Sequence, residues 1–290
     1  MTVASPSVPE PYNALLRRAL DRSSPAVAYD KVFVAATTQN EAKMYALPAM
    51  DPNSDGQILD NANPALSELV WTFTLPPPHP LLSKLIESTP AVYQTGVFFG
   101  GDDGIVWALP TQDPNLNKVI DPDTENLWRY ETWVVHGISE PTANDRVKSS
   151  PAIHDRLDVS PAQRVVFVGA RRSLLALDRE VGTLLWKYII PLDSPPTNDH
   201  PVTASPAIAA GTGMVYIQHE ERDLGVPYAF LYGFLEVEFN PPDGIGDLLW
   251  KRPLSNPPSL SSPAVFDGLL FIGQNPYPGI DYHVWAIKDP

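Results

Sequence analysis

A four-residue motif recurs five times along the chain, and this repetition constrains the fold more than any other feature of the sequence. Each copy reads Ser or Thr, then Pro, then Ala, then Val or Ile, and consecutive copies lie 55 to 65 residues apart. The copies are Ser24–Val27, Thr89–Val92, Ser150–Ile153, Ser205–Ile208 and Ser262–Val265. A recurrence of this kind indicates one supersecondary unit repeated along the chain.

Each motif begins a series of short apolar runs that have the length and composition of β-strands. In the third unit, Val165–Gly169 and Leu174–Leu177 are followed by a run that contains Trp186. Four strands in a unit of this length are typical of a β-propeller blade. Solenoid repeats are about half as long, and a helical period occurs only in Ala14–Leu20. We therefore predict an all-β propeller of four-stranded blades, five in number, whose repeats start near residues 23, 88, 149, 204 and 261.

The five units follow one another without a linker, so we expect residues 13–290 to form one domain after a flexible, Pro-rich tail at residues 1–12. The fifth unit has no fourth apolar run, which leaves a strand edge to be covered. Leu15–Leu20 is similar to Leu248–Leu254, the fourth run of the fourth unit. We expect this N-terminal segment to complete the fifth blade and close the ring. A short helix capped by Asn13 is the alternative, because the segment has high helical propensity.

Tryptophan recurs in the fourth run of four units. Such a flat, apolar ring can fill the wedge between neighbouring blades, and we predict this docking role for Trp71, Trp128, Trp186 and Trp250. The segment from Ala176 to Trp186 resembles the repeat of pyrroloquinoline-quinone proteins, Ala-x-Asp-x-x-Thr-Gly-x-x-x-Trp, with Val181 in place of the Thr. At the level of repeats the resemblance to this quinoprotein family covers about residues 23 to 290.

The quinoprotein resemblance implies two kinds of function, and the fold alone does not choose between them. Quinoprotein dehydrogenases hold the quinone and Ca²⁺ in an eight-bladed propeller and carry a vicinal cysteine disulfide, whereas other family members are quinone-free scaffolds. This chain has five units and no cysteine, and the quinone contacts match no run in it. We therefore expect a non-catalytic scaffold that mediates protein–protein interaction or assembly, without the quinone. A quinoprotein-like dehydrogenase and a carbohydrate-binding or carbohydrate-active propeller are the alternatives.

Charge and hydropathy restrict the partners further. The chain has 34 acidic and 20 basic residues, for a formal net charge of -14, so nucleic acid and anionic membrane surfaces would be repelled. The sequence has no run of 18 apolar residues, so we predict no membrane insertion. Met1–Pro11 lacks the basic and apolar regions of a signal peptide. An extracytoplasmic location, periplasmic or at the cell surface, is what the family resemblance implies.

Oxygen-bearing side chains alternate in the connections between the third and fourth runs of the first two units. In the first, Asp51, Asn53 and Asp55 stand at positions 1, 3 and 5, and Gly56 follows, as at the start of a calcium-binding loop. The candidate metal ligands are Asp51, Asn53, Asp55, Gln57, Asp60, Asp113, Asn115, Asn117 and Asp121. The usual Glu at position 12 is missing, and Asn and Asp also form ordinary Asx turns. A Ca²⁺ site and a purely structural turn therefore both stay open.

Asp102 and Asp103 are adjacent carboxylates and are candidates for a glycosidase pair. They are followed by Gly104 between two apolar runs, and Asp-Asp-Gly in that setting is typical of a hairpin turn. We therefore interpret them as turn residues and predict no catalytic residue.

Overall fold

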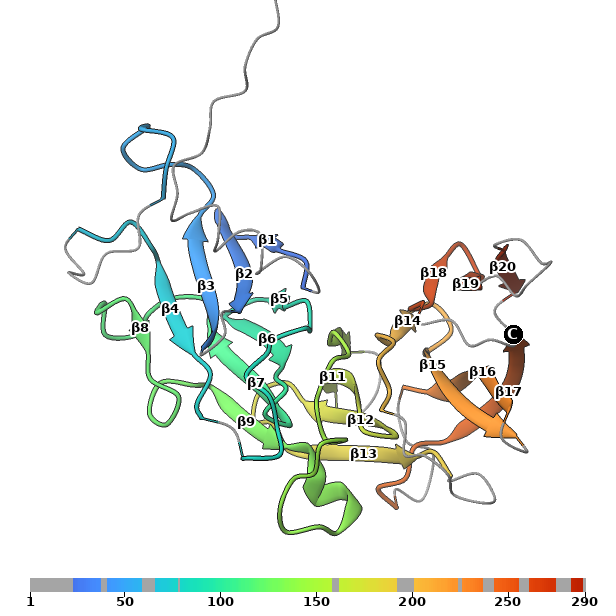
Figure 1. Cartoon of the computed structure of the whole chain (residues 1–290). Helices are drawn as coiled ribbons and strands as arrows, with labels where there is room; N and C mark the ends of the chain where they lie inside the picture. Colours follow the sequence, from blue (N-terminus) through green and yellow to red (C-terminus); the bar gives the residue numbers. More distant parts are fainter. Residues whose placement is uncertain are drawn as a thin grey trace, which may run out of the picture.

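The described part of the chain is almost entirely β-structure (Figure 1). The computed structural model describes residues 23–37, 41–58, 66–77, 79–157, 162–191, 201–223, 226–236, 243–255, 261–274 and 283–288. Within these ranges the strands form five separate sheets, and a short 3-10 helix, η1 (Thr132–His136), follows the second sheet. No helix in the described residues is long and apolar enough to span a bilayer.

Each sheet forms one blade and is built mainly from one sequence repeat. The first blade contains β1 (Ala26–Ala28), β2 (Lys31–Thr37), β3 (Ala42–Pro48), β4 (Trp71–Thr74) and β8 (Val119–Ile120). The second contains β5 (Ala91–Tyr93), β6 (Gly96–Gly100), β7 (Ile105–Pro110) and β9 (Trp128–Glu131). The third contains β10 (Ala152–Arg156), β11 (Gln163–Ala170), β12 (Ser173–Asp178) and β13 (Leu184–Ile189). The fourth contains β14 (Ala207–Ala209), β15 (Met214–Asp223), β16 (Val226–Leu235) and β17 (Leu248–Ser255), and the fifth contains β18 (Ala264–Phe266), β19 (Leu269–Gln274) and β20 (His283–Lys288).

The prediction of an all-β propeller with repeated, mostly four-stranded antiparallel blades is confirmed. In every blade a short connection joins the first strand to the second, which fits antiparallel pairing. The segment that we expected to close the ring, residues 13–22, lies outside the described residues, and so does the predicted tail.

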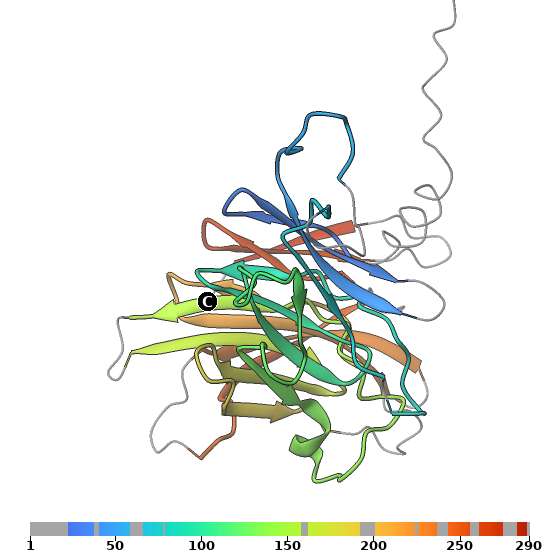
Figure 2. The same ribbon diagram turned by 90° about the vertical axis from the view of Figure 1, so that its left-hand side faces the viewer.

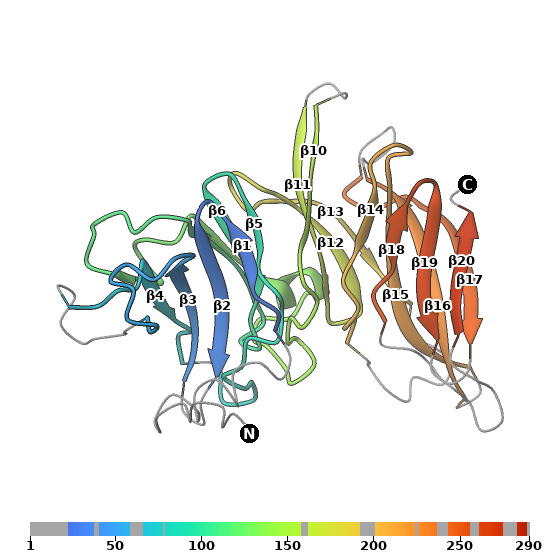
Figure 3. The same cartoon turned by 90° about the horizontal axis from the view of Figure 1, so that it is seen from above.

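The blades follow one another around an open arc (Figures 1 and 3). Their innermost strands contact each other in chain order, β1 with β5, β5 with β10, β10 with β14, and β14 with β18. At the two ends of the arc, β1 and β18 lie apart in both views.

Strand β8 is an addition that the repeat pattern did not indicate. It belongs to the third-to-fourth connection of the second unit, but it pairs in parallel with β4 of the first blade through Thr72↔Val119 and Phe73↔Ile120. The Ile120 side chain is buried in the apolar cluster between the two blades. The outer edge of the first blade is thus covered by backbone hydrogen bonds and by an apolar side chain, as edge strands require.

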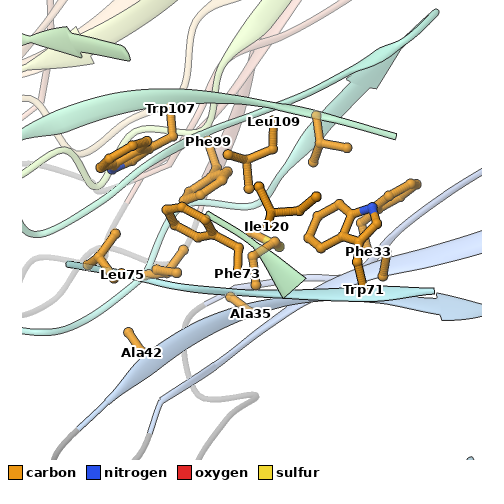
Figure 4. Close-up of a cluster of buried hydrophobic side chains, with 14 residues drawn as sticks. Phe33, Ala35, Ala42, Trp71, Phe73, Leu75, Phe99, Trp107, Leu109 and Ile120 are labelled. Carbon is orange, nitrogen blue, oxygen red and sulfur yellow. The ribbon is translucent and has the colours of Figure 1, made fainter. Parts of the chain in front are cut away.

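The core consists of apolar layers between consecutive blades. Figure 4 shows the layer between the first and second blades, where Phe73 packs against Trp107 and Phe99 at ring-centroid distances of 5.1 and 5.9 Å. Ala35 and Ala42 lie in the same layer, and their small side chains leave room for these rings. Comparable clusters fill the other three junctions. Burial of these layers accounts for the main favourable term in folding.

The repeated motif links the blades by a series of hydrogen bonds along the innermost strands, which we call the serine relay. The Ser24 N–H donates to Thr89 Oγ1 at 3.0 Å, and the Thr89 N–H donates to Ser150 Oγ at 2.9 Å. The Ser150 N–H donates to Ser205 Oγ at 3.0 Å, and the Ser205 N–H donates to Ser262 Oγ at 2.8 Å. Ser or Thr recurs at this position because its hydroxyl satisfies a backbone donor of the preceding blade.

Two of the repeated tryptophans dock onto the next blade in the same way. Trp128 Nε1 donates to the Arg179 carbonyl at 2.7 Å, and Trp186 Nε1 donates to the Glu236 carbonyl at 3.0 Å. Each ring also lies against a glycine of the next blade's third-to-fourth connection. A Cβ at Gly182 would stand 2.6 Å from the ring of Trp128, so only glycine permits this approach.

The other two predicted docking tryptophans also lie between blades. Trp71 is fully buried with its ring centroid 5.9 Å from that of Phe33. Trp250 is half-buried, 5.6 Å from Tyr216 by the same measure. Neither indole N–H has a hydrogen-bond partner among the described residues, so these two contribute to the junctions by packing alone.

Candidate functional site

Two acidic loops at the outer rim of the first two blades carry the predicted metal ligands. The first rim loop, residues 49–58, follows β3 and projects from the body of the protein (Figures 1 and 2). The second rim loop, residues 111–127, follows β7 and includes β8. We call the two loops together with residues 66–70 the double rim.

The first rim loop is held by its own alternating side chains. Asp51 Oδ1 accepts the N–H groups of Asn53 and Ser54 at 3.1 and 3.0 Å, and Asp51 Oδ2 accepts the Gly56 N–H at 2.6 Å. Further along the loop, Asn53 Oδ1 accepts the Asp55 N–H at 3.0 Å. A series of Asx turns therefore satisfies the backbone donors of this exposed loop.

The second rim loop repeats this arrangement. Asp113 Oδ1 accepts the Asn115 N–H at 3.1 Å, and Asp113 Oδ2 accepts the N–H of Lys118, five residues on. Asn115 Oδ1 in turn accepts the Asn117 N–H at 2.9 Å. Lys118 occupies the place that Gly56 has in the first loop and has a positive φ of 66° there. The loop conformation therefore does not depend on glycine, although the sequence alone favours it there.

Two glutamates that the sequence analysis missed complete these loops. The side-chain amide of Asn53 donates to Glu68 Oε1 at 2.5 Å, and that of Asn115 donates to Glu125. The second glutamate also accepts the Asp121 N–H at 2.8 Å. In both loops the Asn at position 3 contacts a Glu that lies outside the motif. The sequence does not show this correspondence, because the number of residues between the Asn and the Glu differs between the two loops.

Segment 66–70 joins the two rim loops. While Glu68 contacts the first loop, the carbonyl of its neighbour Ser67 accepts a hydrogen bond from the Lys118 ammonium of the second. The Thr72 N–H donates to the Lys118 carbonyl at 2.9 Å, just before the β4–β8 pairing begins. The double rim is therefore one connected unit that spans two blades.

Hydrogen bonds favour the charged form of two carboxylates of the double rim, Asp51 and Asp121. Desolvation acts to raise the pKa of Asp51, but the backbone N–H groups of its own loop together outweigh it and bring the pKa below the ordinary value. Hydrogen bonds from Asp123 and Thr124 lower the pKa of Asp121. The double rim is thus negatively charged at neutral pH.

The side chains named as metal ligands mostly face their own backbone. Among the described residues, no three His, Cys, Asp or Glu side chains are arranged so that they could hold a metal ion. Asp55 Oδ1 accepts the Gln57 N–H at 2.9 Å, and Asp60 lies outside the described residues. Calcium binding at the rim loops therefore stays a prediction.

Apolar side chains stand exposed within this acidic surface. Met50 and Leu116 have 81% and 82% of their surfaces exposed, each beside the oxygen-rich turn of its loop. Leu66, Val119 and Leu127 of the same unit are also exposed. These exposed apolar groups lie on loops of one connected unit, and binding residues are often found on loops that a rigid scaffold positions.

Asp102 and Asp103 lie in the turn between β6 and β7, where the Gly104 N–H donates to the Gly101 carbonyl at 3.1 Å. Both side chains are buried. Asp102 accepts a hydrogen bond from Ser83, and Asp103 accepts one from Trp107 Nε1 at 2.9 Å.

Burial raises the pKa of both carboxyl groups, that of Asp103 to about 7. The two carboxyl groups have separate partners, and almost none of their surface is exposed to a substrate. This arrangement fits the turn interpretation better than that of a glycosidase pair.

Comparison with known proteins places the chain among propellers by fold. No family model matches the chain, and no curated protein matches its sequence. A quinohemoprotein alcohol dehydrogenase from Comamonas testosteroni is similar in structure, with 12% identity and a TM-score of 0.51 over 89% of this chain. A Mitotic Checkpoint Complex chain gives 8% identity and a TM-score of 0.51 over 92% of this chain. BamB from Moraxella catarrhalis gives 12% identity and a TM-score of 0.44, with 89% of this chain and 72% of that chain covered.

The chain spans 40% of the dehydrogenase and 64% of the checkpoint chain. At these identities the likeness shows the fold, a β-propeller, and nothing about activity.

Proposed function

We propose that this chain is a non-catalytic β-propeller scaffold whose double rim binds a protein partner. The exposure of Met50 and Leu116 on hydrogen-bonded loops carries this proposal. Because side-chain turns already fix the loop backbones, little conformational entropy is lost on binding. The apolar tips can then enter pockets of a partner and act as the residues that contribute most to affinity.

The charge of the double rim defines the chemistry of that partner. The rim carboxylates, including Asp51 and Asp121 with lowered pKa, surround the apolar tips. A protein surface with basic groups around an apolar pocket complements them, and the attraction between opposite charges speeds association. Nucleic acid would be repelled by the same charges.

Selection of peptides from a display library on the full chain tests the proposal. The rim variant Met50→Asp/Leu116→Asp serves as the comparison, and Val181→Asp, an exposed apolar residue in the turn after β12, is the matched control. We expect enriched basic, apolar peptides whose Kd rises at least tenfold with the rim variant and stays unchanged with the control. Peptides that bind the rim variant and the unchanged chain equally would overturn the assignment of the double rim.

Two further measurements separate this function from the alternatives. Reconstitution with pyrroloquinoline quinone and Ca²⁺, followed by an absorbance scan and a dye-linked alcohol oxidation assay, detects a dehydrogenase. Binding to an array of glycans detects a carbohydrate-specific propeller. We expect neither activity, and a turnover that requires the quinone would replace the scaffold proposal by the dehydrogenase.

We also propose that Ca²⁺ binds the first rim loop, where Asn53 and Asp55 supply oxygens that keep free lone pairs beside their backbone hydrogen bonds. Asp51 adds a carboxylate that accepts the N–H groups of its own loop. An affinity of about 10⁻⁴ to 10⁻³ M is typical of extracellular modules, and it would suit the extracytoplasmic location that the family resemblance implies. Millimolar Ca²⁺ should raise the thermal midpoint, since it binds only the folded state. Asp55→Ala should abolish this gain, and no shift in the unchanged protein would leave an Asx-turn loop.

A further inference from the structure

The two ends of the arc present opposite faces of the same kind of blade, and both faces are mostly apolar. The trailing face of the fifth blade carries Ala264, Phe266, Leu269, Phe271, Val284 and Ala286, with Lys288 beside Leu269. The leading face of the first blade carries Val27, Val32, Val34, Ala36, Tyr45 and Leu47, together with Lys43 and, on β4, Thr72 and Thr74. Phe266 and Val27 have 74% and 73% of their surfaces exposed. Apolar faces of this kind mark interaction sites.

Strand register shows that these faces are the two halves of a junction that the chain already makes four times. In every blade the Ala of the repeated motif pairs with an aromatic residue: Ala26↔Phe33, Ala91↔Phe98, Ala152↔Phe167, Ala207↔Tyr216 and Ala264↔Phe271. The first four aromatic residues are buried in the apolar layer shared with the next blade. Only Phe271, on the trailing face, remains half-exposed in this series.

The opposite half of each junction follows the same register. At each junction, the aromatic ring of one blade lies in the same layer as an aliphatic residue of the blade that follows. These aliphatic residues are Val97, Val166, Val215 and Leu270. The first-blade equivalent is Val32, which pairs with Val27 and is half-buried. Phe271 and Val32 are therefore matching groups at opposite ends of the arc.

The serine relay ends in the same complementary way. Its last hydroxyl, that of Ser262, accepts the Ser205 N–H, and its first N–H, that of Ser24, donates to Thr89. In the described part of the chain, the Ser262 N–H and the Ser24 hydroxyl have no relay partner. A contact between the two faces would supply each with the other.

The arc itself keeps the two faces of one chain apart. In a ring of five blades, each junction turns by one fifth of a circle, and four such turns would bring β18 beside β1. In Figures 1 and 3 the two strands lie well apart. The turn at each junction is set by close-packed layers, which resist a change of angle.

We propose that the trailing face of one copy packs against the leading face of a second copy, head to tail. Phe271 then enters the layer beside the second copy's Val32, and the relay continues from one chain into the other. Such a contact is heterologous, since the two copies contribute different faces. It lies at the ends of the arc and does not use the double rim, so it stands independently of the proposed function.

Two single variants and their mixture test this junction by sedimentation velocity over a range of concentrations at about 0.15 M salt, where charge repulsion is screened. Phe266→Asp removes the trailing face and Val27→Asp removes the leading face, and neither side chain is needed for the interior because both are exposed. We expect the unchanged chain to assemble with rising concentration and each variant alone to stay monomeric. An equimolar mixture retains one intact face of each kind and should form dimers and nothing larger.

The controls make each outcome decisive. The rim variant Met50→Asp/Leu116→Asp should assemble as the unchanged chain does, which separates this contact from partner binding at the double rim. Far-UV circular dichroism checks that the variants are folded, and Phe266→Ser and Val27→Ser replace any Asp variant that is not. Assembly of either single variant alone, or no dimer in the mixture, overturns the head-to-tail contact. A monomeric unchanged chain at every concentration overturns it as well and indicates closure within one chain.

Discussion

Replacement of Trp186 by Ala should be among the most destabilising single changes in this protein. The side chain is buried, its ring centroid lies 5.7 Å from that of Phe167 and 6.2 Å from that of Phe234, and its Nε1 donates to the Glu236 carbonyl. Truncation of a buried Trp costs about 3 to 5 kcal/mol. We expect about 5 kcal/mol here, because the ring is packed between two blades and a buried carbonyl also loses its donor.

Phenylalanine variants separate packing from hydrogen bonding at this junction. Trp186→Phe keeps most of the buried ring but leaves the Glu236 carbonyl unpaired, which costs about 1 to 3 kcal/mol. Trp71→Phe is the matched control, because its indole N–H is equally buried but has no hydrogen-bond partner among the described residues. It should cost less than Trp186→Phe, since it removes ring area without removing a hydrogen bond.

Urea unfolding followed by far-UV circular dichroism gives the free energy of unfolding without relying on tryptophan emission. Trp285→Ala provides a second comparison, because that side chain is 42% exposed. If Trp186→Ala costs no more than Trp285→Ala, the docking role that we assign to Trp186 is wrong. If Trp186→Phe and Trp71→Phe lower the free energy of unfolding equally, the hydrogen bond to Glu236 contributes nothing, although the packing role of Trp186 would stand.

Three further changes probe other parts of the fold. Gly182→Ala should lower the thermal midpoint, because Gly182 has a φ of +72° and a new Cβ would meet the docked indole, whereas Gly211→Ala, with open space around it, should be nearly neutral. Burial raises the pKa of Asp103 to about 7, so the folded state keeps a proton that the unfolded state loses above about pH 4. The free energy of unfolding should therefore fall as the pH rises from about 4 to 7, and Asp103→Asn should reduce that slope in pH-dependent urea unfolding. Ser150→Ala should cost about 1 kcal/mol in the same assay by breaking the serine relay, and Ser24→Ala less, since the Ser24 hydroxyl accepts no relay bond in the described part of the chain.

The blades could be predicted from the sequence because their determinants are local. Runs such as Val165–Gly169 are rich in β-branched residues and are separated by turn residues, so strand positions follow from composition and spacing. The repeated motif also indicated that the units are equivalent. It did not indicate that its Ser or Thr hydroxyl serves the preceding blade, because that contact joins residues 55 to 65 positions apart.

The features that the sequence did not indicate depend on contacts between units. Strand β8 consists of Val119 and Ile120 alone, and so short a run becomes a strand only where β4 offers its edge. Glu68 and Glu125 fill the same place in the two rim loops but stand seventeen and twelve residues after Asp51 and Asp113. No fixed spacing could have revealed them. The alternating Asp and Asn residues, by contrast, make local contacts. The structure places them in Asx turns, which is one of the two interpretations that the sequence left open.

Strand β8 also has a consequence for the order in which this protein folds. The outer edge of the first blade is finished only by residues 119–120, so during synthesis that blade stays incomplete until most of the second unit has emerged from the ribosome. The first two blades should therefore gain and lose their structure together, although repeat architectures allow neighbouring units to unfold one at a time. Hydrogen exchange would report this as similar protection for the β4 and β8 amides. The second unit therefore folds less independently, because its strand β8 completes the first blade.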